Sequence, residues 1–151
     1  YDLRLSSKEF LIFRHIPGTV MNPKKFNPDN LEKTVLHHDD DGDFFILPAH
    51  SYGLGVALEK MKVPENITVI CIGKSTYARL GIIVNTTPAE AGWEGHLTLE
   101  FSNSSGADCR IYAKEGICQL LFFEGDPCST TYGDRKGKYQ NQPEKVTLAK
   151  I

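Results

Sequence analysis

Short stretches in which apolar and polar residues alternate follow one another along most of the chain. Alternation with a period of two, interrupted by turn residues, is typical of β-strands. The predicted strands cover residues 1–5, 9–13, 44–48, 52–58, 67–72, 82–84, 95–101, 109–112 and 117–123. One short helical turn is predicted over residues 75–80, with Ser75 as its N-cap and Gly81 ending it. Many short strands with little helix predict an all-β sandwich or barrel.

Two segments lack this periodicity. Residues 17–43 are rich in Pro, Asn, Lys and Asp, which predicts a long, irregular surface excursion. Residues 132–142 are polar and glycine-containing, which predicts a mobile C-terminal arm. The chain begins inside a strand-like run and without a methionine, so we expect a missing N-terminal segment. The 151 residues predict a single domain without internal repeats.

Charge and composition narrow the classes of function. A formal net charge of −2 and a pI of about 6.2 argue against binding duplex DNA through a broad basic face. No apolar run reaches membrane-spanning length, and nothing resembles a signal peptide. The four cysteines are widely spaced without a CxxC motif, which favours reduced, structural thiols. We therefore expect a cytoplasmic protein that binds neither nucleic acid nor membrane.

Residues 73–79 concentrate hydroxyl groups and cations in one turn. Their Gly-Lys-Ser sequence resembles the end of a P-loop, but Thr68 stands where that motif needs a glycine. Two hydroxyls, a lysine and an arginine at the start of a helical turn nevertheless suit an anion. The alternative is a capped surface turn with solvated cations.

Strand 96–101 carries a candidate general base. Its alternation places Leu97, Leu99 and Phe101 on one face, and Glu100 on the other face with His96 and Thr98. If that polar face lines a cleft near an arginine, the carboxylate becomes a candidate base. The arginine would keep the carboxylate ionised, whereas burial would raise its pKa. The alternative is a solvated carboxylate on a strand.

Zinc and calcium motifs are not matched. Residues 37–43 contain metal-ligand residue types without the spacing of a calcium loop, so we interpret them as a solvated acidic loop. No histidine has a glutamate two residues later, and Cys128 lacks the second cysteine of a P-C-x-x-C motif, which excludes a zinc deaminase. Trp93, in the turn at residues 90–95, is interpreted as a residue that braces the turn or stacks on a base.

Several separated segments together resemble the dCTP deaminase family, a branch of the trimeric dUTPase-like fold. They are residues 73–81 (GKSTYARLG), 92–101 (GWEGHLTLEF), 115–119 (EGICQ), 137–142 (GKYQNQ) and the early strand at residues 1–4. The resemblance covers nearly the whole chain in the family's order. It implies an all-β, distorted β-barrel or jelly roll of the β-clip type, with one short helix, in a homotrimer. Residues 1–151 would form one such domain, with residues 132–151 as a C-terminal lid.

The same resemblance implies zinc-independent hydrolytic deamination of dCTP to dUTP and ammonia. Glu100 would shuttle protons for a water that attacks C4 of cytosine, while Ser75 and Arg79 would hold and polarise that water and the base edge. The other implied substrate contacts are Lys74, Thr76, Tyr77, Ala78, Glu90, Trp93, Thr98, Leu99, Gln119, Tyr132, Lys138, Tyr139 and Gln142.

The resemblance also implies partners and an assembly. Mg²⁺ would ride on the substrate triphosphate without a ligand from the protein. Active sites would be shared between the subunits of the trimer, so that a monomer is inactive. The product dUTP would supply dUMP and dTTP synthesis, and dTTP is an expected inhibitor.

Two alternatives stay open. The first is a dUTPase, or a bifunctional enzyme that deaminates and then cleaves to dUMP and diphosphate; residues 89–93 (AEAGW) replace the V-I-D-x-x-Y-x-G turn of a dUTPase, which disfavours it. The second is a catalytically silent nucleotide-binding regulatory module, against which the retention of Ser75, Arg79 and Glu100 argues. Glu90 stands where some family members have an aspartate near the sugar, which leaves its role in deoxyribose recognition open.

Overall fold

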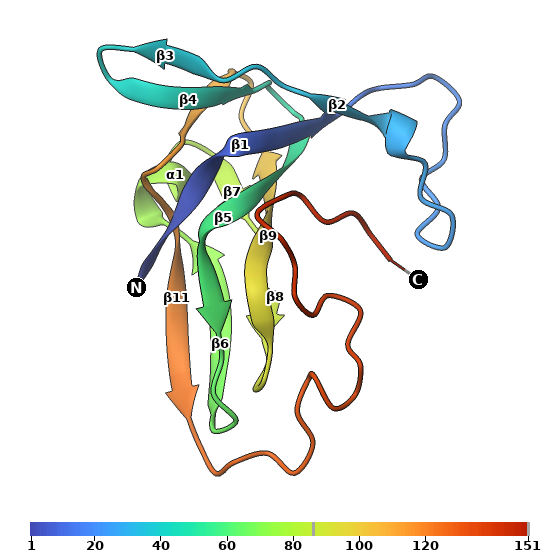
Figure 1. Cartoon of the computed structure of the whole chain (residues 1–151). Helices are drawn as coiled ribbons and strands as arrows, with labels where there is room; N and C mark the ends of the chain where they lie inside the picture. Colours follow the sequence, from blue (N-terminus) through green and yellow to red (C-terminus); the bar gives the residue numbers. More distant parts are fainter. Residues whose placement is uncertain (86, 151) are drawn as a thin grey trace.

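The computed structural model, which describes residues 1–85 and 87–150, is mostly β (Figure 1). The strands are β1 (Asp2–Phe13), β2 (Leu31–Lys33), β3 (His37–Asp39), β4 (Gly42–Leu47), β5 (Tyr52–Lys62), β6 (Ile67–Gly73), β7 (Ile82–Val84), β8 (Thr87–Ala89), β9 (Glu94–Asn103), β10 (Cys109–Tyr112) and β11 (Gly116–Glu124). A 3-10 helix, η1 (Pro28–Asn30), precedes β2, and the short α-helix α1 (Ser75–Ala78) follows β6. The predicted all-β class with one short α-helix is confirmed.

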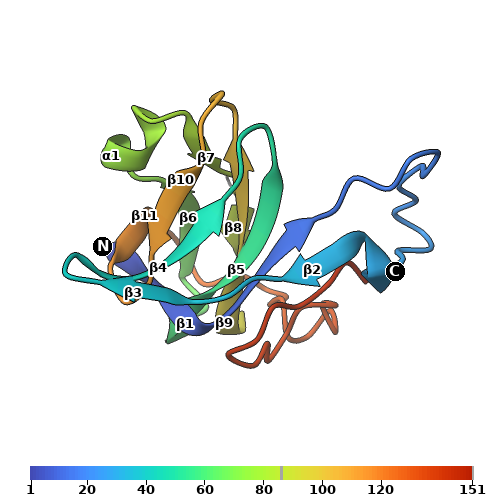
Figure 2. The ribbon, with the colours of Figure 1, turned by 90° about the horizontal axis from the view of Figure 1, so that it is seen from above.

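Antiparallel pairing joins most of the strands into one curled sheet. The order is β7-β9-β5-β1-β11-β6-β8, with β2 added to β1, while β10, β4 and β3 form a separate sheet of three strands. Figure 2 shows the β3–β4 hairpin lying across one end of the curled sheet, and the excursion between β1 and β2 projecting away from it. In Figure 1 the two termini lie on opposite sides of the molecule.

Strand β1 joins the two halves of the large sheet. Its first residues pair with β11 through Arg4, whereas its second half pairs with β5 and β2. The pairing with β5 is irregular between Leu5 and Phe10. The sequence predicted two strands here, separated by a polar break; the structure has one strand because Ser6 is buried and the chain continues through the irregularity.

Large apolar side chains from both sheets meet in one core. Phe10 of β1 packs between Phe45 of β4 and Phe101 of β9, with ring centroids 5.2 Å and 5.4 Å away. Leu3, Leu5, Leu47, Leu99, Ile111 and Ile117 are fully or almost fully buried around these rings. Each such side chain contributes on the order of 1.5–3 kcal/mol by leaving water. All four cysteines are free, and Cys71 and Cys118 are buried in this core, as expected for structural thiols.

The short helix begins differently from the prediction. Its N-cap is Lys74, whose side chain makes no capping hydrogen bond, and Ser75 is already the first helical residue. Ser75 as a cap is therefore wrong, because the extended backbone of β6 continues one residue further, to Lys74. Gly81 has a φ of +80°, so a glycine ends the turn as predicted.

The segment after β11 packs back along the sheet. The Asn141 amide donates to the Glu94 carbonyl at 2.8 Å, and the His96 amide donates to the Gln142 carbonyl at 3.0 Å. Val146 is buried against Leu54 and Val56. We call residues 139–150 the tail; Figure 1 shows it in red beside β9. Its fixed position comes from strand-like contacts that its irregular sequence pattern does not reveal.

No helix in the described part of the chain is long and apolar enough to cross a membrane.

Gly53 tests how tightly β5 packs on β1. A Cβ atom at this position would lie 2.6 Å from Cε1 of Phe10, whose ring is held by two other aromatic rings. We expect Gly53→Ala to lower the free energy of unfolding by about 1–3 kcal/mol, the usual cost of overpacking a core. Urea denaturation measures this loss. Gly125→Ala is the control, because nothing lies within 4 Å of its Cβ position; equal losses in both variants would contradict the packing.

Candidate active site

Strand β9 presents its side chains alternately to the core and to a cavity. Leu97, Leu99 and Phe101 are buried, whereas Thr98 and Glu100 on the opposite face are half-buried, as the alternation predicted. Glu100 lines a cavity of about 460 Å³, which we call the Glu100 cavity. This volume lies within the range of small-molecule sites.

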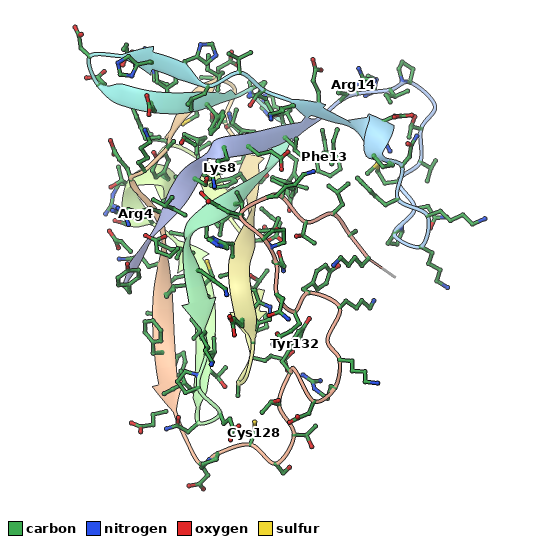
Figure 3. All side chains as sticks on the ribbon, in the orientation of Figure 1. Arg4, Lys8, Phe13, Arg14, Cys128 and Tyr132 are labelled. Carbon is green, nitrogen blue, oxygen red and sulfur yellow. The ribbon has the colours of Figure 1, made fainter. Side chains whose placement is uncertain are left out.

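The Glu100 cavity gathers many of the predicted substrate contacts. Its predicted members come from β9, from the turn before it and from the C-terminal segment: Glu90, Trp93, Thr98, Glu100, Tyr132, Tyr139 and Gln142. Figure 3 labels Tyr132 and also Phe13, which come from distant parts of the sequence and lie on the side of the sheet along which the tail runs. One chain therefore assembles this part of the site by itself.

Apolar residues that the sequence did not single out close the other side of the cavity. Phe13 of β1, Phe26 of the excursion and Leu54 of β5 all line it. Phe13 packs edge-on against Phe26 and Tyr52, with ring centroids 6.2 Å and 5.5 Å away. Phe26 has no apolar neighbours in the sequence, so only its packing against Phe13 and its place in the cavity lining show that it faces the same space as Glu100.

Burial governs the charge of Glu100. Desolvation raises the pKa of its carboxyl above the ordinary value of 4.5. The pKa of Tyr52 is raised as well, first by burial and then by the negative charge of Glu100. Asn85 donates to the Tyr52 hydroxyl at 2.6 Å. Tyr52 and Asn85 are thus polar neighbours of the carboxylate that the sequence pattern did not indicate.

A second cluster surrounds α1. Lys74 pairs with the Asp2 carboxylate at 2.5 Å, and the Gln119 amide donates to the same carboxylate at 3.0 Å. These two hydrogen bonds, from Lys74 first and Gln119 second, lower the pKa of Asp2. A second cavity, of about 590 Å³, is lined by Lys74, Thr76 and Tyr77 among others. Asp2 therefore joins two predicted substrate contacts, Lys74 and Gln119, that lie far apart in the sequence.

Tyr77 anchors α1 to the three-stranded sheet. Its side chain is buried, and its hydroxyl accepts a hydrogen bond from the Tyr112 amide at 3.1 Å. Burial raises the pKa of Tyr77 to about 12. Its neighbours Ser75, Ala78 and Arg79 are exposed, and the Arg79 guanidinium donates to the Ser75 carbonyl at 3.0 Å. With Tyr77 buried, α1 presents the side chains of Ser75 and Arg79 to solvent.

The predicted catalytic residues do not meet within one chain. Among the described residues, neither Ser75 nor Arg79 lines the Glu100 cavity or the second cavity. Burial is the main cause of the raised pKa of Glu100, and no described cation is among the causes. Two further predicted contacts also lie elsewhere: Leu99 points into the core, and Lys138 donates to the Lys150 carbonyl at 3.2 Å.

Trp93 braces the C-terminal segment as well as its own turn. Its side chain is 3% exposed, and its indole N–H donates to the Tyr139 carbonyl at 2.9 Å. The Tyr139 amide in turn donates to the Tyr132 hydroxyl at 3.0 Å. Glu90, at the edge of the same turn, pairs with Arg135. The bracing interpretation is confirmed, and the indole still lines the cavity.

The acidic run at residues 37–43 forms a hairpin whose carboxylates pair with basic side chains. His38 and Lys114 both pair with Asp43, and Arg110 pairs with Asp39 at 2.6 Å. Among residues 1–85 and 87–150, no group of three or more His, Cys, Asp or Glu side chains has the geometry to hold a metal ion.

Comparison with known proteins identifies the class to which this fold belongs. The crystal structure of 2′-deoxycytidine 5′-triphosphate deaminase from Agrobacterium tumefaciens matches with a TM-score of 0.57. The match covers 82% of this chain and 38% of that chain at 17% identity, so it shows the fold alone. The predicted mainly β fold, similar to that of a dCTP deaminase, is confirmed.

Sequence comparison then identifies the family. The model of the dCTP deaminase-like family matches residues 1–125. A dCTP deaminase from Campylobacter curvus is 51% identical over 152 aligned residues, which cover all of this chain and 77% of the relative. A dCTP deaminase from Paramagnetospirillum magneticum is 47% identical, and the alignment covers all of this chain and 78% of that protein. The chain belongs to the dCTP deaminase-like family.

The raised pKa of Glu100 predicts how its replacement changes stability. Burial favours the protonated carboxyl, so its contribution to stability is full below the ordinary pKa of 4.5 and is lost as pH rises through the raised value. We expect Glu100→Gln to be more stable than the wild type at neutral pH, with an advantage that shrinks as pH falls toward 4.5.

Urea denaturation from about pH 4 to about pH 8 measures this difference. Glu65→Gln, which removes an exposed carboxylate, is the control and should show no such trend. A Glu100→Gln advantage that stays constant over this range would mean that the carboxylate is not desolvated.

Proposed function

We propose that this protein hydrolyses dCTP to dUTP and ammonia. The observation that carries the proposal is the half-buried Glu100 carboxylate in a cavity of about 460 Å³, on a chain 51% identical to a protein named dCTP deaminase. Desolvation raises the pKa of this carboxyl, which makes the carboxylate a stronger base and suits it to take and return protons.

The proposed reaction needs one mobile proton carrier. Glu100 removes a proton from a water as the water oxygen adds to C4 of cytosine. The carboxylic acid passes this proton to N3, which leaves a tetrahedral C4 that carries a hydroxyl and the amine. Glu100 then takes the proton of the C4 hydroxyl and gives it to the exocyclic amine; the C4–N bond breaks, ammonia leaves and C4 becomes the uracil carbonyl. The walls that Trp93 and the tail give the cavity support the proposal, because they reduce the access of bulk water and so strengthen such transfers.

We further propose that Ser75 and Arg79 enter this reaction from a neighbouring copy of the chain in a homotrimer. Both side chains are exposed and lie outside the Glu100 cavity of their own chain. The chain also exposes the apolar side chains of Leu121, Phe122 and Phe123 on β11, which an assembly would cover. A guanidinium from a second copy would hold and polarise the attacking water beside the Glu100 carboxylate.

Phosphate binding falls to the surroundings of α1. Lys74, Thr76 and Gln119 offer an ammonium, a hydroxyl and an amide, which suit phosphate oxygens better than a metal ion. In this proposal Mg²⁺ is carried by the triphosphate and supplies charge neutralisation only, and no zinc takes part. The same contacts would admit dTTP as a competing inhibitor and dUTP as product, in a cytoplasmic enzyme.

Incubation of the purified protein with dCTP or dUTP, followed by separation of the nucleotides, tests the reaction. We expect dUTP from dCTP with Mg²⁺ present, dUTP left intact, and no loss of activity with a zinc chelator. Formation of dUMP from either substrate would instead support the bifunctional or dUTPase alternative. Binding of dCTP without any product would support the regulatory alternative.

Replacement of the carboxylate tests its role in that reaction. We expect Glu100→Gln to lower turnover by at least about 10³-fold, because a carboxamide cannot accept the proton. Its affinity for dCTP, measured by calorimetry, should stay within a few-fold of the wild type. Near-native turnover in this variant would overturn the mechanism.

Co-expression of two inactive variants tests whether the site is shared. Arg79→Ala subunits keep Glu100, and Glu100→Gln subunits keep Arg79. Random assembly should therefore restore about a quarter of the wild-type activity, since a quarter of the interfaces combine both native residues. The control replaces the second partner by the double variant Arg79→Ala/Glu100→Gln, with which no interface is complete. Equal inactivity of both mixtures would show that each site lies within one chain.

A further inference from the structure

The hydroxyl group of Thr98 makes two hydrogen bonds to the tail. Its oxygen accepts from the Thr147 amide at 3.0 Å, and its hydrogen is donated to Oε1 of Gln142, also at 3.0 Å. Thr98 thereby holds two points of the tail that are five residues apart. The other described hydrogen bonds between β9 and the tail use only backbone groups of β9, at Glu94 and His96; one of them joins the Glu94 amide to Oε1 of Gln140 at 3.2 Å.

Thr98 is also placed to affect the cavity. It lies two residues before Glu100 on the same face of β9, and both side chains line the Glu100 cavity. Three parts of the tail near it, Tyr139, Gln142 and Thr147, form another wall of that cavity. The position of this wall therefore depends on the face of β9 that carries the proposed base.

The hydrogen bond from Thr98 also shows how the Gln142 amide is oriented. The Thr98 oxygen accepts from the Thr147 N–H, and its hydroxyl hydrogen is donated to Oε1 of Gln142, so it is the carbonyl side of this amide that faces Thr98. Gln142 is 7% exposed, and its amide nitrogen makes no hydrogen bond with any of the described residues. That N–H₂ group remains a donor for a ligand in the cavity.

We propose that Thr98 is a positioning residue for substrate binding: its hydroxyl anchors the tail over the Glu100 cavity and turns the Gln142 N–H₂ group toward the nucleotide. The inference rests on the proposed function for its ligand, dCTP. It differs from a direct substrate contact because Thr98 acts through Gln142 and Thr147. The chemistry recognised is an oxygen acceptor on the nucleotide.

Thr98→Val removes the hydroxyl and keeps the shape of the side chain. We expect the KM for dCTP to rise about tenfold, the effect of losing roughly 1.4 kcal/mol of hydrogen bonding, with a smaller change in kcat. Thr98→Ser, which retains the hydroxyl, should restore the wild-type KM. Thr68→Val, on the exposed face of β6, is the matched control and should leave KM unchanged.

Limited trypsin digestion provides a readout that does not depend on activity. Lys138 and Lys145 lie beside the anchored residues, so a released tail should be cleaved there several-fold faster in Thr98→Val than in the wild type or in Thr98→Ser. Mass spectrometry identifies the cleavage sites. If Thr98→Val does not fold, Thr98→Ala replaces it in both experiments.

The outcomes separate this inference from the proposed function. A wild-type protein that makes no dUTP from dCTP would overturn the proposed function, while trypsin would still test the anchor. A Thr98→Val variant with wild-type KM and wild-type cleavage would overturn the anchor in an active deaminase. A higher KM that Thr98→Ser fails to restore would mean that the methyl group, and not the hydroxyl, positions the site.

Discussion

The alternation of side chains along β9 is the constraint on which both the fold and the site depend. One face carries Leu99 and Phe101 into the core, where Phe101 packs against Phe10 of β1. The other face carries Thr98 and Glu100 into the cavity. Because the period of a strand is two, a slip of one residue would bury Glu100 in the core and expose the apolar residues. Core packing thus holds the proposed base in place.

The second consequence concerns what one chain leaves incomplete. The Glu100 cavity has an apolar side, an aromatic brace at Trp93 and a wall made by the tail. The α1 turn is just as well fixed, through Tyr77 and through the pairing of Lys74 with Asp2, yet it presents Arg79 to solvent. The Glu100 cavity and the α1 turn are each held in place, but Arg79 does not reach Glu100 within one chain. For this reason the proposed mechanism includes a second copy of the chain.

The strands and the side chains that line the site differ in how far the sequence could predict them. Alternation was enough for β9 and for the burial of Leu99, because it is a local property of the chain. Other features depend on contacts between segments that are far apart in the sequence, which no local pattern encodes. They are the position of Phe26 in the cavity lining and the link that Asp2 makes between Lys74 and Gln119. The sequence predicted two strands in place of β1 because a serine is usually exposed, whereas Ser6 is buried and the strand continues through it.

A crystal structure of Glu100→Gln with dCTP and Mg²⁺ bound tests the central claim most directly. The account predicts the cytosine ring in the Glu100 cavity, with the amide of residue 100 and the guanidinium of Arg79 from a neighbouring copy both within about 3 Å of one water near C4. A nucleotide bound elsewhere, or an Arg79 that points away from the base in every copy of the assembly, would contradict it.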